Sequence, residues 1–138
     1  MLGQAHIYYV KIPEGTNPLE AVAEAARQLD LEFAFIQGIG GLEEARVGVF
    51  HGSGYTPYDV RPMEGHIMEV ASLSGNVVRG PDGKYYPHLH VVLAVRGDKV
   101  YAGHLLGARV KPFLEVFLIS GASTPKDIAS LFAHRWSG

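Results

Sequence analysis

Two histidines separated by one residue stand out in the segment Tyr86-Pro87-His88-Leu89-His90. In a β-strand, residues i and i+2 point to the same face and lie about 7 Å apart, so both imidazoles can reach one metal ion. His104 lies on the next expected strand, and three histidines with an open position are typical of a zinc site that keeps a water or a substrate atom. The sequence contains no cysteine, so any transition metal must be held by nitrogen and oxygen ligands.

The histidine pair alone is weak evidence, because seven histidines in 138 residues give roughly 0.3 such pairs by chance. Ordinary hydrogen-bonded histidines therefore remain an alternative. Strand parity adds a test. A two-residue turn at Gly97-Asp98 would pair Val91 with His104 and turn His104 away from the other two histidines. The three-histidine site thus requires an odd-length loop, or a bulge near Gly103.

Two glutamates are candidate catalytic residues, because each shares a strand face with apolar residues. Glu69 is expected on the same strand face as Ile67, Ala71 and Leu73, and Glu115 on the same face as Phe113, Phe117 and Ile119. A carboxylate facing a core needs a partner, and beside a metal it could move a proton. The alternative is a structural carboxylate, or a face that meets solvent or another subunit.

The elements that would position these residues are mostly strands. A helix is predicted after Asn17, which is followed by Pro18 at the first helical position and Glu20 at the third. Strands are predicted at 5–12, 33–36, 45–50, 65–73, 76–79, 86–95, 99–106 and 113–119, with a loop from His51 to Tyr58. A short C-terminal helix is expected to start at Thr124-Pro125-Lys126-Asp127. The pattern predicts one α+β domain over 1–138, with a curved, barrel-like, mainly antiparallel sheet of about seven strands, one main helix and a short C-terminal helix.

Charge and hydropathy exclude several classes of protein. Twelve basic and fourteen acidic residues give a net charge of −2, which argues against binding to DNA or RNA through bulk positive charge. No signal sequence and no apolar run of about 18 residues is present, so we expect a cytosolic protein without a membrane partner.

Several motifs taken together resemble the plant and prokaryote conserved (PPC) domain family over about residues 3–120. They occur in the order Gly65-His66-Ile67-Met68-Glu69-Val70, Ser72-Leu73-Ser74-Gly75-Asn76, Asp82-Gly83, His88-Leu89-His90, Gly103-His104-Leu105 and Glu115-Val116. The resemblance implies a homotrimer with zinc on His88, His90 and His104. The chain is similar to the stand-alone prokaryotic type, because it has no Arg-Gly-Arg AT-hook. The fold and the histidines also resemble, more distantly, those of acetolactate decarboxylase, a zinc lyase.

Three functions follow as hypotheses. The first is a homotrimeric, zinc-binding regulatory or ligand-binding domain, with a small molecule at the metal. The second is a zinc-dependent, lyase-like enzyme acting on a small keto or hydroxy acid, with Glu69 or Glu115 as the acid or base. The third is a transcription-associated protein that binds DNA, or a regulatory protein, through the trimer surface. DNA binding would require a basic patch and a steep dependence on salt.

Overall fold

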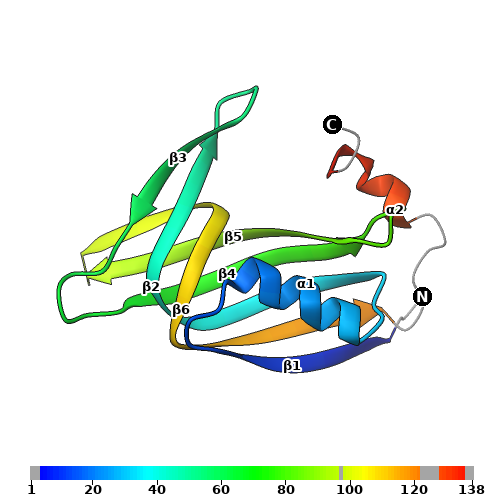
Figure 1. Ribbon diagram of the computed structural model, residues 1–138, viewed down its shortest axis with the longest axis horizontal. Helices are drawn as coiled ribbons and strands as arrows, with labels where there is room; N and C mark the ends of the chain where they lie inside the picture. Colours follow the sequence, from blue (N-terminus) through cyan, green and yellow to red (C-terminus); the bar gives the residue numbers. More distant parts are fainter. Residues whose placement is uncertain (1–3, 97, 122–127, 136–138) are drawn as a thin grey trace.

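The computed structural model describes residues 4–96, 98–121 and 128–135 (Figure 1). The elements in chain order are β1 (Ala5–Pro13), α1 (Pro18–Gln28), β2 (Phe33–Phe50), β3 (Tyr55–Val60), β4 (Met68–Arg79), β5 (Tyr85–Arg96), β6 (Lys99–Gly121), α2 (Ile128–Leu131) and a 3-10 turn (Ala133–Arg135). The predicted α+β class with a mainly antiparallel sheet is therefore confirmed.

The six strands form one sheet in the order β1-β6-β5-β4-β2-β3, and every pairing in it is antiparallel. A further pairing between β6 and β2 joins β2, β4, β5 and β6 into a closed ring. Strand β1 is added outside the ring on β6, and β3 is added on β2. The ring leaves these four strands no open edge between them, which fits the predicted barrel-like curvature.

Long strands that bend replace several of the short strands predicted from the sequence. The segments predicted at 33–36 and 45–50 belong to the single strand β2, which passes through Gly38-Ile39-Gly40-Gly41 without ending. At Gly40 the φ angle is +145°, and the register with β4 shifts between Gly38 and Gly40. A glycine and a bulge thus let the strand turn where the sequence suggested a break.

Two further expectations concern shorter elements. Residues 55–58, predicted as part of a loop, belong to the edge strand β3, whose Pro57 is tolerated because β3 pairs only with β2. The predicted start of the C-terminal helix at Thr124-Pro125-Lys126-Asp127 lies outside the described residues, and the helix is described from Ile128 to Leu131.

Helix α1 forms as the sequence predicts and packs on the sheet (Figure 1). The Asn17 side chain accepts a hydrogen bond from the backbone N–H of Leu19 at 3.1 Å, and Pro18 begins the first turn. Val22 and Ala26 are fully buried against the sheet. The helix therefore covers one part of the apolar interior.

The core consists of alternate residues of the strands together with the buried face of α1. Its largest fully buried side chains are those of Ile12, Leu42, Met68, Leu73, Leu89, Leu93, Leu105, Leu114 and Leu118. On β5 the buried Leu89 separates His88 from His90, so both histidines point out of the ring. No helix within the described part of the chain is long and apolar enough to cross a membrane.

Candidate metal centre

The three histidines predicted as metal ligands converge on one point. One nitrogen from each of His88, His90 and His104 lies within 4.8 Å of the others. Their ring centroids are 5.0 to 5.6 Å apart, and the rings are tilted to one another by 56° to 83°. Three nitrogens that each lie about 2.1 Å from one ion would be less than 4.8 Å apart. A small rotation of the side chains would therefore bring the three ligands to the metal.

A bulge in β5 brings His104 to the same face as the other histidines. Arg96 pairs with Lys99, as expected for a tight turn, but Ala94 pairs with Val100. One extra residue, Val95, therefore lies on β5 between these two pairs. The register beyond it pairs His90 directly with His104. The parity requirement is met by this bulge, which lies beside the turn rather than near Gly103.

A glycine lets the neighbouring strand approach the histidines. Gly75 on β4 has a φ of +151°, and a Cβ built on it would lie 1.9 Å from the carbonyl oxygen of His88. Beside it, Asn76 pairs with His88 and Ser74 pairs with His90. Only glycine fits this position, because any side chain would push the β5 backbone away at the first ligand.

An aromatic ring covers the other side of the site. Tyr55 of β3 stacks on His104 with ring centroids 4.3 Å apart and the planes tilted by 14°. Gly48, which pairs with His104, makes this possible, because a Cβ there would lie 2.9 Å from that of Tyr55. Sequence reasoning missed Tyr55, because its segment was read as a loop.

Unpaired nitrogen atoms favour a metal at this point. His88 Nε2 and His104 Nδ1 are buried and have no hydrogen-bond partner within the described part of the chain. Buried polar atoms are normally paired, so two unpaired nitrogens on histidines of this cluster fit a ligand set for a cation. The donor set of three neutral imidazoles suits zinc, which leaves a fourth position open.

Burial favours the neutral, metal-binding form of His88 and His104. Burial, followed by the positive charge of Arg135 and the neighbouring histidines, lowers the pKa of His88 from its usual 6.5 to about 4. Burial and His90 also lower the pKa of His104. At neutral pH the lone pair of His88 is thus available without the loss of a proton.

The two candidate catalytic glutamates lie apart from the histidines. Glu69 is exposed on β4. Ala71 is an extra residue in the register with β5, so the buried face of β4 continues from Val70 to Leu73, and Glu69 no longer shares a face with Leu73. Glu115 is half-buried on the outer face of β6, where Tyr9 donates a hydrogen bond to it at 3.2 Å. Neither carboxylate therefore faces the core, which agrees with the alternative of a face that meets solvent or another subunit, and neither belongs to the histidine group.

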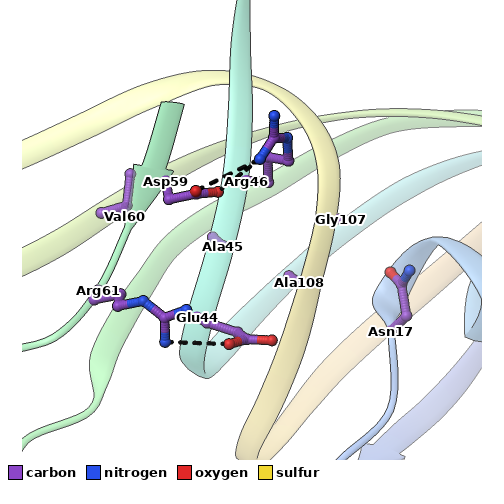
Figure 2. A pocket seen from close by; sticks show the side chains of 9 residues that line it. All are labelled: Asn17, Glu44, Ala45, Arg46, Asp59, Val60, Arg61, Gly107 and Ala108. Carbon is purple, nitrogen blue, oxygen red and sulfur yellow. Dashed lines mark hydrogen bonds and ion pairs between the residues drawn. The ribbon is translucent and has the colours of Figure 1, made fainter. Parts of the chain in front are cut away.

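A separate cavity of about 350 Å³ lies between β2, β3 and β6 (Figure 2). Its charged side chains neutralise each other in pairs. Arg46 lies 3.3 Å from Asp59, and Arg61 lies 3.2 Å from Glu44. These exposed pairs leave no unmatched charge among the charged residues drawn in Figure 2, so the histidine cluster remains the candidate site.

The comparisons with known proteins agree with this geometry. The model of the Plants and Prokaryotes Conserved (PCC) domain matches residues 2–122. The chain belongs to this family. The resemblance predicted from the motifs is confirmed, and the match includes all three histidines. A comparison with curated proteins finds no match.

Two solved structures share most of the PCC fold with this chain. A metal-containing protein from Archaeoglobus fulgidus is 25% identical, with a TM-score of 0.75 over 89% of this chain and 86% of that chain. A plant- and prokaryote-conserved protein from Pyrococcus horikoshii is 28% identical, with a TM-score of 0.77 over 89% of this chain and 84% of that chain.

Acetolactate decarboxylase from Bacillus subtilis is a more distant structural neighbour of the PCC domain. It is 12% identical, with a TM-score of 0.54 over 91% of this chain and 64% of that chain. This confirms the expected structural resemblance. At this identity the likeness concerns the fold alone.

Proposed function

We propose that this PCC domain binds one zinc ion per chain through His88, His90 and His104, and serves as a regulatory or ligand-binding domain. The convergence of the three ligand nitrogens within 4.8 Å carries the proposal. The absence of cysteine and the two unpaired buried nitrogens support it. The metal content of the Archaeoglobus protein supports a metal in this fold. Zinc with three protein ligands holds its fourth position open to water or to a small ligand.

The test of the zinc site is the metal content of the purified protein. We expect one zinc per chain in the wild type, and the loss of most of it in His88→Ala, His90→Ala and His104→Ala. The matched control is His66→Ala, because His66 is exposed, lies outside the cluster and contacts the carbonyl oxygen of Glu64. Equal metal content in all four variants would refute the proposal.

The proposed assembly is a homotrimer, and the outer face of the sheet supports it. Neighbouring positions on β1, β6 and β2 form rows across this face, such as Ile7–Ile119–Phe35. Ile7 is 66% exposed and Phe35 is 58% exposed. Tyr9 and Phe117 extend the patch, with ring centroids 5.5 Å apart. Such a patch is costly in water and stable when a second subunit covers it.

The mass of the protein in solution tests this assembly. A trimer of 15.0 kDa chains has a mass of about 45 kDa, since 3 × 15.0 = 45. The variant Phe117→Lys places a charge inside the patch and is expected to yield monomers in analytical ultracentrifugation. The control Val100→Lys alters a residue that is 62% exposed on the part of β6 that pairs with β5. A monomeric wild type would refute the assembly.

The alternative functions have less support. A lyase would need an acid or base at the metal, and the two glutamates considered for that role lie outside the histidine group. DNA binding would need a basic surface, yet the net charge is −2 and arginines such as Arg46, Arg61 and Arg109 are paired with carboxylates.

A further inference from the structure

A hollow of about 330 Å³ opens beside the histidine cluster. Its walls include His88, His104 and Tyr55, and Arg135 of the 3-10 turn lines it as well. Figure 1 shows the β2–β3 hairpin and the C-terminal helix on the same side of β5, which agrees with this arrangement. A cavity of this size accommodates a small molecule.

Arg135 is held in this hollow by contacts that do not neutralise its charge. It is half-buried, and its Nη1 donates a hydrogen bond to the backbone carbonyl of Tyr86 at 3.2 Å. Its guanidinium carbon lies 4.6 Å from the centre of the Phe132 ring. Its Nε is buried and has no hydrogen-bond partner in the described ranges.

Arg79 and Arg96, unlike Arg135, form ion pairs with carboxylates. Arg79 lies 2.7 Å from Asp30, and Arg96 lies 2.8 Å from Asp98. Within residues 4–96, 98–121 and 128–135, no carboxylate forms an ion pair with Arg135. A half-buried cation with a buried, unpaired donor is costly unless an anion compensates it.

We infer that this hollow binds a small organic carboxylate, which pairs with the Arg135 guanidinium and places a neighbouring oxygen on the metal. The inference rests on the proposed zinc site. A guanidinium fits the two oxygens of a carboxylate, and zinc accepts an oxygen atom at its fourth position. The stacked ring of Tyr55 supplies an apolar wall on the His104 side. Arg135 lies beyond the residues that match the PCC family, so membership of the family does not supply this role.

The test uses two probes of nearly equal shape and different charge. The protein is loaded with Co²⁺, whose visible absorption reports a change in its ligands, and is titrated with lactate or with the neutral lactamide. Because a charge-assisted pair is involved, we expect lactate to bind at least about tenfold more tightly than lactamide in the wild type. In Arg135→Gln this preference is expected to fall clearly, because only the charge of Co²⁺ still favours lactate, while Co²⁺ still binds.

The control Arg96→Gln removes an arginine that pairs with Asp98 at the far end of β5 and should keep the preference for lactate. Circular dichroism and thermal melting show whether Arg135→Gln stays folded, and Arg135→Lys, which keeps the charge without the planar fork, should retain part of the preference.

Equal binding of lactate and lactamide in the wild type, or an undiminished preference in a folded Arg135→Gln, would overturn the inference alone. Tighter binding of sulfate than of lactate would overturn the assignment of a carboxylate. Failure of the wild type to bind Co²⁺ or Zn²⁺ would overturn the proposed zinc site as well, so the two failures are distinguishable.

Discussion

The substitution Gly75→Ala should damage both the fold and the metal centre. Two costs add at this position. The left-handed φ of +151° costs roughly 1–2 kcal/mol for an alanine. The new methyl group, 1.9 Å from the carbonyl oxygen of His88, adds about 1–3 kcal/mol of overpacking. The sum of about 2–5 kcal/mol corresponds to a fall in Tm of roughly 8–20 °C for a chain of this length.

Two glycine controls separate these costs. Gly83 has a φ of +81° and open space around it, so Gly83→Ala should lose only the 1–2 kcal/mol or so of strain. Gly107 also has open space and no left-handed φ, so Gly107→Ala should be neutral or slightly stabilising. Thermal unfolding of the metal-free proteins measures these differences.

Zinc affinity supplies the second half of this prediction. Relief of the clash moves the β5 backbone at His88, so Gly75→Ala should bind zinc at least about tenfold more weakly. Gly83→Ala and Gly107→Ala should bind it normally, as measured by competition with a chelator. A Gly75→Ala protein with the Tm and zinc affinity of Gly107→Ala would refute the reasoning.

Two other perturbations have expected outcomes. His88 takes up a proton near pH 6.5 in the unfolded chain and only near pH 4 in the folded chain, so the metal-free protein should lose stability as the pH falls through this window. Denaturant unfolding should show a smaller loss of stability in His88→Asn, and an identical loss would contradict the burial of this ring. Tyr55→Ala removes the ring stacked on His104 and should weaken zinc binding about tenfold, whereas Val49→Ala on the same hairpin, 56% exposed, should leave it unchanged in chelator competition.

Local signals in the sequence predicted the parts that depend on neighbouring residues. The start of α1 follows from the side chain of Asn17 and the ring of Pro18, both of which act within one turn. The common face of His88 and His90 follows from the period of a strand. The α+β class follows from many strands in succession beside one clear helix.

The faces on which His104, Glu69 and Glu115 lie could not be predicted from the sequence, and register shifts explain the first two. The bulge at Val95 decides the face of His104, yet valine carries no bulge signal. The extra residue Ala71 reverses the parity of β4 and moves Glu69 to the surface. On β6 the period-two pattern was correct, but both faces are apolar, so the sequence did not show that Glu115 lies on the outer one.

Contacts between distant segments were beyond sequence reasoning. Tyr55 meets His104 across 49 positions of chain, and Arg135 meets the carbonyl oxygen of Tyr86 across the same separation. The residues that flank Arg135 in the sequence did not indicate that its side chain lines a hollow beside the histidine cluster. Such placements depend on tertiary packing, which local propensity does not encode.

X-ray absorption at the zinc edge tests the central claim most directly. The account predicts one zinc per chain with three imidazole nitrogens at about 2.0–2.1 Å and a fourth ligand that binds through oxygen and is not a histidine. The signal should be absent when His88, His90 and His104 are all replaced by alanine in a protein that still folds. A wild-type protein without stoichiometric zinc, or an unchanged zinc spectrum in the triple variant, would contradict it.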